Sequence, residues 1–77
     1  MNITQLQQFA NHLQQRIDTN PNDLDAIADL SVVLVQLGQT AHALSLLLPA
    51  AQKYPEHTGL QHNLAELYLS LIHISEP

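Results

Sequence analysis

The sequence contains no cysteine and no tryptophan, and only two of its 77 residues are basic. Without cysteine there can be no disulfide bond and no thiolate metal site. Nucleic-acid binding requires clustered lysine and arginine side chains that neutralise phosphates. This chain has seven acidic residues and a formal net charge of −5. We therefore expect neither a nucleic acid nor an anionic membrane as its partner.

Aromatic residues are also scarce, being limited to Phe9, Tyr54 and Tyr68. Alanine and leucine supply most of the apolar side chains, and no segment alternates apolar with polar residues as a half-buried strand does. The longest apolar run, around residues 43–51, is too short to span a bilayer. The amino terminus has neither the basic start nor the apolar stretch of a signal peptide. These features favour an all-α protein of the cytoplasm.

Apolar residues follow helical spacing in four segments that are separated by proline or glycine. Pro21 and Pro55 interrupt the pattern in two places, and Gly38 ends a segment between them. The spacing predicts helices over residues 3–17, 24–37, 40–53 and from residue 58 onward. A chain of this size forms one small domain at most.

The ends of these helices carry local signals. Asn22 or Asp23 is expected to cap the second helix, and Thr58 with Gln61 matches a capping box for the fourth. Pro49 falls inside the third helix, where it removes one backbone hydrogen bond at a cost of about 3 kcal/mol in an isolated helix. Because Pro49 lies on the expected solvent face, we predict one kinked helix rather than two short ones.

The two prolines Pro21 and Pro55 lie thirty-four residues apart, and other positions recur at the same interval. The matching pairs are Leu13 with Leu47, Leu30 with Leu64, and Leu34 with Tyr68. A fixed period of this length indicates stacked helical hairpins, each of which buries its apolar face against its neighbours.

At this interval the chain resembles a tetratricopeptide repeat. The residues that carry the resemblance are Ile27, Leu30, Ser31, Leu34, Ala43, Leu47 and Pro55, with Gly38 at the hairpin turn. Aliphatic residues replace the family's aromatic ones at three of these places. The resemblance implies one domain over residues 1–77, an all-α short α-solenoid of antiparallel helical hairpins with about four helices. Residues 2–18 would be the second helix of a preceding repeat, 24–57 a full repeat, and 58–68 the first helix of the next.

Residues 69–77 resemble something else, the translation of a transposase sequencing adaptor. We expect this tail to be non-native and the natural protein to continue in another sequence beyond residue 68. The chain would then be a fragment of a longer repeat protein.

The family resemblance implies a protein–protein interaction module in which the first helices of successive repeats line a concave groove. It assigns seven residues to that groove: Asp25, Asp29, Val32, Gln36, His62, Asn63 and Glu66. Their polar, net acidic character suits a basic or polar peptide, and Asp29 would repel a ligand's terminal carboxylate. The same residues also fit an ordinary solvated face of an amphipathic helix.

Other functions have weaker support. Asp25 and Asp29 lie one helical turn apart, but paired carboxylates need an enclosing pocket to act as acid and base. His57 and His62 are five residues apart, off the spacing that aligns two metal ligands on a helix. We therefore expect no catalytic residue, no metal and no cofactor. Two alternatives stay open: the amino-terminal docking region of a multidomain enzyme such as a transferase, and self-association through the uncovered last helix.

Overall fold

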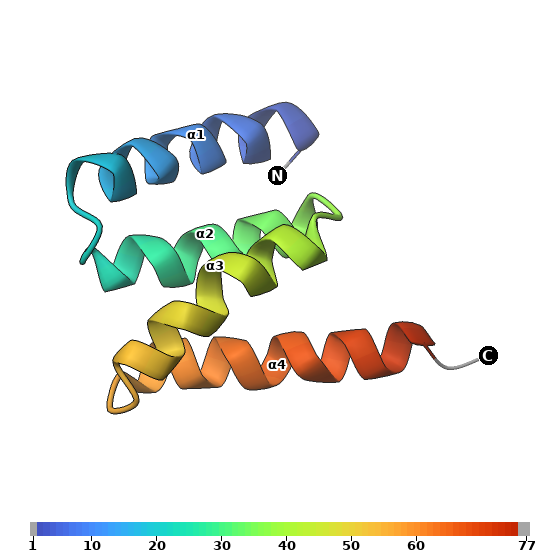
Figure 1. The fold of residues 1–77 in the computed structure, drawn as a ribbon. Helices are drawn as coiled ribbons and strands as arrows, with labels where there is room; N and C mark the ends of the chain where they lie inside the picture. Colours follow the sequence, from blue (N-terminus) through green and yellow to red (C-terminus); the bar gives the residue numbers. More distant parts are fainter. Residues whose placement is uncertain (1, 76–77) are drawn as a thin grey trace.

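The computed structural model describes the backbone of residues 2–75 and the side chains of residues 2–70. Within this part the chain forms helices α1 (Ile3–Thr19), α2 (Leu24–Gln36), α3 (Thr40–Lys53) and α4 (Thr58–Ser75). Figure 1 shows consecutive helices running back and forth as hairpins. The all-α architecture predicted from the sequence is confirmed, and each helix starts at the predicted residue. Helix α4 continues to Ser75, so it extends into the suspected tail, whose last two residues lie outside the described part.

Helix α2 is the centre of the described part. It packs against α1 on one side, against α3 within the hairpin, and against α4, while α3 also packs against α4 (Figure 1). Helix α1 contacts α2 alone among these helices. Helices α2 and α4 therefore contact each other directly. Helix α3 separates them only in the sequence.

The core is built mainly of leucine and alanine. Each helix contributes one leucine that is almost completely withdrawn from solvent: Leu13, Leu30, Leu47 and Leu60. The residues of α2 that carry the family resemblance, Ile27, Leu30, Ser31 and Leu34, are all buried. Ala41 and Ala65 are exposed. Burial of the leucines drives the helices together, since most of the stability of helices in proteins comes from packing of an apolar face.

The two proline turns have the same hydrogen bonds one period apart. In the first, the N–H of Asp23 donates to the carbonyl of Asn20 at 3.0 Å, and in the second the N–H of His57 donates to the carbonyl of Tyr54 at 3.1 Å. The Tyr54 hydroxyl also donates to Oδ1 of Asn22 at 3.0 Å, which links the two turns. The repeat visible in the sequence is thus also a repeat of backbone geometry.

Gly38 ends α2 as the sequence predicts. Its φ of 79° lies in the left-handed region. The N–H of Gly38 donates to the carbonyl of Val35 at 3.0 Å, and the N–H of Gln39 donates to Leu34 at 2.8 Å. This pair of bonds is the Schellman arrangement, which satisfies carbonyls at the end of a helix and directs the chain into the next one.

Pro49 does not divide its helix. Helix α3 is continuous over Thr40–Lys53 with Pro49 inside it, and Pro49 is exposed as predicted. Figure 1 shows the ribbon of α3 changing direction along its length. Because the proline faces solvent, water can bond the carbonyl that it leaves without a partner. The bend brings the second half of α3 toward α4.

Candidate functional site

The structure places the seven predicted groove residues on the two helices expected to line a groove, α2 and α4. Those of α2 are all exposed: Asp25, Asp29, Val32 and Gln36. On α4, His62 and Glu66 are exposed and Asn63 is half-buried. Exposure alone does not define a binding site, because binding sites are concave. Residues that act together should line the same cavity between α2 and α4.

A hollow of about 200 Å³ lies between α2 and α4, with α3 beneath it. Its lining residues are Ser31, Val32, Val35, Gln36, Leu47, Asn63, Glu66, Leu67 and Ser70. The hollow thus brings together four of the predicted residues, namely Val32, Gln36, Asn63 and Glu66, while the other three do not line it. Sequence reasoning missed the apolar residues of its walls and floor, because they were assigned only to the core.

Asn63 holds the two helices together beside this hollow. Its Nδ2 donates to the carbonyl of Ala28 on α2 at 3.1 Å. The same carbonyl accepts the hydroxyl of Ser31 at 2.6 Å, within α2 itself. The Asn63 amide nitrogen is therefore used to position α4 on α2, and Ser31 has its hydrogen bond satisfied inside its own helix.

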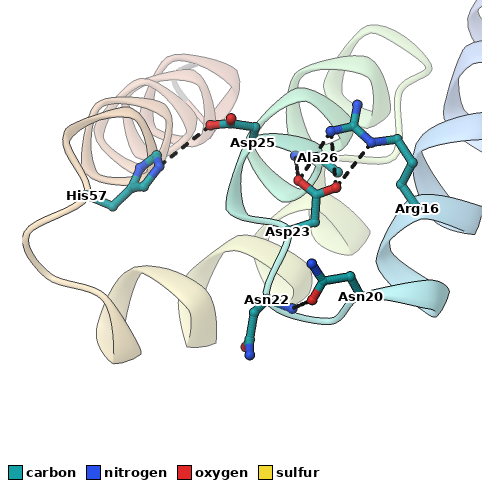
Figure 2. A network of polar contacts seen from close by, with 7 residues as sticks. All are labelled: Arg16, Asn20, Asn22, Asp23, Asp25, Ala26 and His57. Carbon is teal, nitrogen blue, oxygen red and sulfur yellow. Dashed lines mark hydrogen bonds and ion pairs between the residues drawn. The ribbon is translucent and has the colours of Figure 1, made fainter.

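The amino-terminal end of α2 carries a separate polar network, which Figure 2 shows in detail. Asp23, rather than Asn22, caps the helix, since its Oδ1 accepts the N–H of Ala26 at 3.1 Å. Arg16 of α1 forms two hydrogen bonds to the Asp23 carboxylate, at 3.1 and 3.2 Å. This pair is partly exposed to solvent, so its contribution to stability is at most about 1 kcal/mol. Arg16 is thus paired with Asp23 and does not line the hollow.

The amino-terminal end of α4 is capped by a histidine. Nδ1 of His57 accepts the N–H of Leu60 at 3.1 Å. A ring nitrogen that accepts cannot carry the proton, so Nε2 carries it in the neutral ring. Nε2 lies 3.8 Å from Oδ1 of Asp25, beyond hydrogen-bond distance but close enough for electrostatic attraction (Figure 2). His57 stands one period after Asp23 and takes over its capping role.

The predicted capping box of α4 is therefore wrong. Thr58 is the first residue inside the helix rather than its cap, and the N–H of Gln61 donates to the carbonyl of His57 at 3.2 Å. Instead, Nε2 of Gln61 donates to the carbonyl of Ala51 at 2.8 Å. The residue four positions after Ala51 is Pro55, which has no N–H to offer. Gln61 thus supplies the hydrogen bond that Pro55 cannot.

Removing the imidazole cap should weaken the attachment of α4. His57→Ala leaves the Leu60 N–H without its partner, and we expect a loss of about 1 kcal/mol in the free energy of unfolding. His57→Asn restores a capping oxygen and should recover most of that loss. Urea denaturation followed by circular dichroism gives both values; equal destabilisation by the two variants would contradict the capping role.

The lining of the hollow contains one charged side chain. It is Glu66, whose Oε1 lies 3.2 Å from Nε2 of His62. Both side chains are about two-thirds exposed, at 67% and 66%. Lys53, the second basic residue of the chain, lies over the ring of Tyr54, 5.5 Å from its centroid. Neither Arg16 nor Lys53 lines the hollow.

Among residues 2–75, no helix has the length and apolarity needed to cross a membrane. The same part of the chain holds no group of three or more histidine, aspartate or glutamate side chains placed to bind a metal ion.

The comparisons with known proteins agree with the repeated geometry. Comparison with curated proteins and with solved structures returns no match. The family model described as tetratricopeptide repeat matches residues 5–58, which is more than half of the chain. That range contains the hairpin of α2 and α3, both proline turns and most of α1. The chain therefore belongs to the tetratricopeptide repeat family.

Proposed function

We propose that this protein is an interaction module that receives a peptide or protein segment along the face shared by α2 and α4. The hollow between these helices is the observation that carries the proposal. It is too small for a typical small-molecule ligand, but a side chain projecting from another protein can enter it. Tetratricopeptide repeats typically act as non-catalytic scaffolds that bind proteins.

The charge of this face supports a basic or polar partner. Asp25, Asp29 and Glu66 are exposed on α2 and α4, and neither basic residue of the chain lies among the seven proposed groove residues. The field of a net acidic protein attracts cationic segments and speeds their association. Our proposal places this interaction in the cytoplasm, where repeats of the family commonly act.

A non-enzymatic role is also supported by the surroundings of the carboxylates. The Asp25 side chain is 86% exposed, and Asp29 is exposed as well. A carboxylate in water has no apolar enclosure that would prepare it for proton transfer.

Site-specific photo-crosslinking tests the binding face. A photoreactive residue is introduced at Gln36, which lines the hollow, and in a matched variant at Gln52, which is exposed on α3. Each protein is irradiated in an extract of the source organism, and adducts are identified by mass spectrometry. We expect adducts to a defined protein from Gln36 and background alone from Gln52. Equal adducts from both positions, or none from Gln36, would count against the groove.

Self-association through α4 is a second, independent part of the proposal. Tyr68 is 43% exposed, whereas Leu34, one period before it, is buried under the helices around it. Exposed apolar residues of this kind favour contact with a second copy. Light scattering over a dilution series should show a dimer that dissociates on dilution and is weakened by Tyr68→Ser. A monomer at all concentrations would remove this part of the proposal.

A further inference from the structure

We infer that the hollow between α2 and α4 is an anchor pocket for one aliphatic side chain of the partner, and that a lysine or arginine stands close to that side chain in the partner's sequence. This inference rests on the proposed function and adds the chemistry of the ligand to it. The pocket would recognise a leucine, isoleucine or methionine with a neighbouring cation.

The lining of the pocket includes four apolar side chains. Val32 and Val35 of α2, Leu47 of α3 and Leu67 of α4 all line it, and Leu47 and Leu67 are almost completely buried. A volume of about 200 Å³ is several times the roughly 30 Å³ that one water molecule occupies in the liquid, so a branched aliphatic side chain fits. Filling this space displaces water that has few polar partners, which favours binding.

The floor offers a ligand no unsatisfied hydrogen bond. The Ser31 hydroxyl already donates to the carbonyl of Ala28, and the amide nitrogen of Asn63 donates to the same atom. Among the described side chains, no buried nitrogen or oxygen lacks a partner. A polar side chain placed against Val35, Leu47 and Leu67 would lose hydration there, so this part of the lining favours an apolar side chain. The exposed side chains of Gln36 and Glu66 remain able to bond polar groups beside it.

The hydrogen bond from Asn63 to Ala28 explains the position of the pocket along α2 and α4. Asn63 ties α4 to α2 at Ala28, and the hollow begins beyond this tie, toward Gln36 and Ser70. Ser31 of α2 is small and occupies little of the space between the helices. Ser70, the other small lining residue, belongs to residues 69–77, which we expect to be non-native, so the inference depends on the lining up to Leu67.

The rim determines the charge of the residue beside the anchor. Glu66 is the one charged side chain of the lining, and His62 is its exposed neighbour one turn earlier. A lysine or arginine of the partner can therefore pair with the Glu66 carboxylate. A ligand that carries a carboxylate or phosphate next to its apolar residue would be repelled, which separates this partner from acidic peptides and from nucleic acids.

Selection from a library of short random peptides displayed on phage tests the inference directly. The full 77-residue chain is immobilised as the target, and enriched peptides are sequenced. We expect enrichment of an aliphatic residue within a few positions of lysine or arginine. An enriched motif without this pair would overturn the anchor but leave the groove intact, whereas failure to enrich any peptide would count against both proposals.

Four variants then locate the binding of the enriched peptide by fluorescence anisotropy. Val32→Trp fills the hollow, and Gln52→Trp adds the same side chain on the exposed face of α3. Glu66→Gln removes the rim charge, and Glu56→Gln removes one exposed charge elsewhere. We expect Val32→Trp to weaken binding at least about tenfold and Glu66→Gln several-fold, with both controls unchanged.

The outcomes of these variants separate the possibilities. Loss of affinity with Val32→Trp but not with Gln52→Trp supports the anchor pocket. Unchanged affinity with Val32→Trp overturns it, even if the peptide binds elsewhere on α2 or α4. Equal effects of Glu66→Gln and Glu56→Gln overturn the pairing of the cation with Glu66, since only the net charge would then matter. Circular dichroism of each variant confirms that the helices remain formed.

Discussion

Replacement of Leu47 by alanine should remove most of the protein's stability. Leu47 is completely buried in α3, at the point where α2 and α4 meet, and it also forms the floor of the hollow. Its truncation loses apolar burial from two helix–helix contacts and leaves a cavity, which together cost about 3 kcal/mol. A core of this size supplies only about 3–5 kcal/mol of net stability. About 0–2 kcal/mol would then remain, so up to about half of Leu47→Ala should be unfolded at room temperature and its urea midpoint should fall close to zero.

Leu69→Ala is the matched control for this experiment. It removes the same atoms from a leucine that is 65% exposed on α4. We expect its free energy of unfolding to stay within about 0.5 kcal/mol of that of the starting protein. If Leu47→Ala unfolded at the same urea concentration as Leu69→Ala, the result would contradict the burial of Leu47 between α2 and α4.

The second large effect should come from Gly38→Val. Gly38 has a φ of 79°, and a Cβ atom added there would meet no atom within 4 Å beyond its chain neighbours. The expected cost is therefore conformational rather than steric crowding with neighbours. A left-handed residue other than glycine costs about 1–2 kcal/mol, and a β-branched residue is especially unfavourable there. We expect a loss of about 2 kcal/mol in the free energy of unfolding, measured by urea denaturation.

Gly38→Asn serves as the comparison, because asparagine tolerates left-handed geometry better than other residues with a side chain. We expect it to lose less than half of what Gly38→Val loses. Equal losses would show that the hairpin turn does not depend on the backbone conformation of Gly38.

The helices could be predicted from the sequence because their breaks are unambiguous. Pro21, Gly38 and Pro55 each act locally, through backbone geometry that depends little on the rest of the fold. The apolar spacing between these breaks then indicates which face is buried, and Leu13 and Leu47 lie in the core one period apart as expected. Helix starts and the all-α fold follow from these local rules.

The cap of α4 could not be found by the same rules. His57 is an unusual capping residue, while Thr58 followed by Gln61 has the pattern of a capping box. The structure resolves the conflict through tertiary contacts, since Gln61 bonds the carbonyl of Ala51 instead. The thirty-four-residue period did contain the signal, because it places His57 at the position of Asp23.

The candidate site was only partly predictable. Helical periodicity places Val32, Gln36 and Glu66 on exposed faces, and the structure brings all three to one hollow. Periodicity cannot show how far apart two helices stand, so neither the depth of the hollow nor the tie from Asn63 to Ala28 could be foreseen. Ser70, a small residue opposite α2, is visible in the sequence only as a polar position.

The proposed binding face is most directly tested by nuclear magnetic resonance. The ¹⁵N-labelled protein is titrated with the peptide enriched from the library, and backbone amide shifts are followed residue by residue. We expect the largest changes at residues 31–36 of α2 and 63–70 of α4, with little change in α1. Changes concentrated in α1 or on the exposed side of α3 around Gln52 would contradict a binding face between α2 and α4.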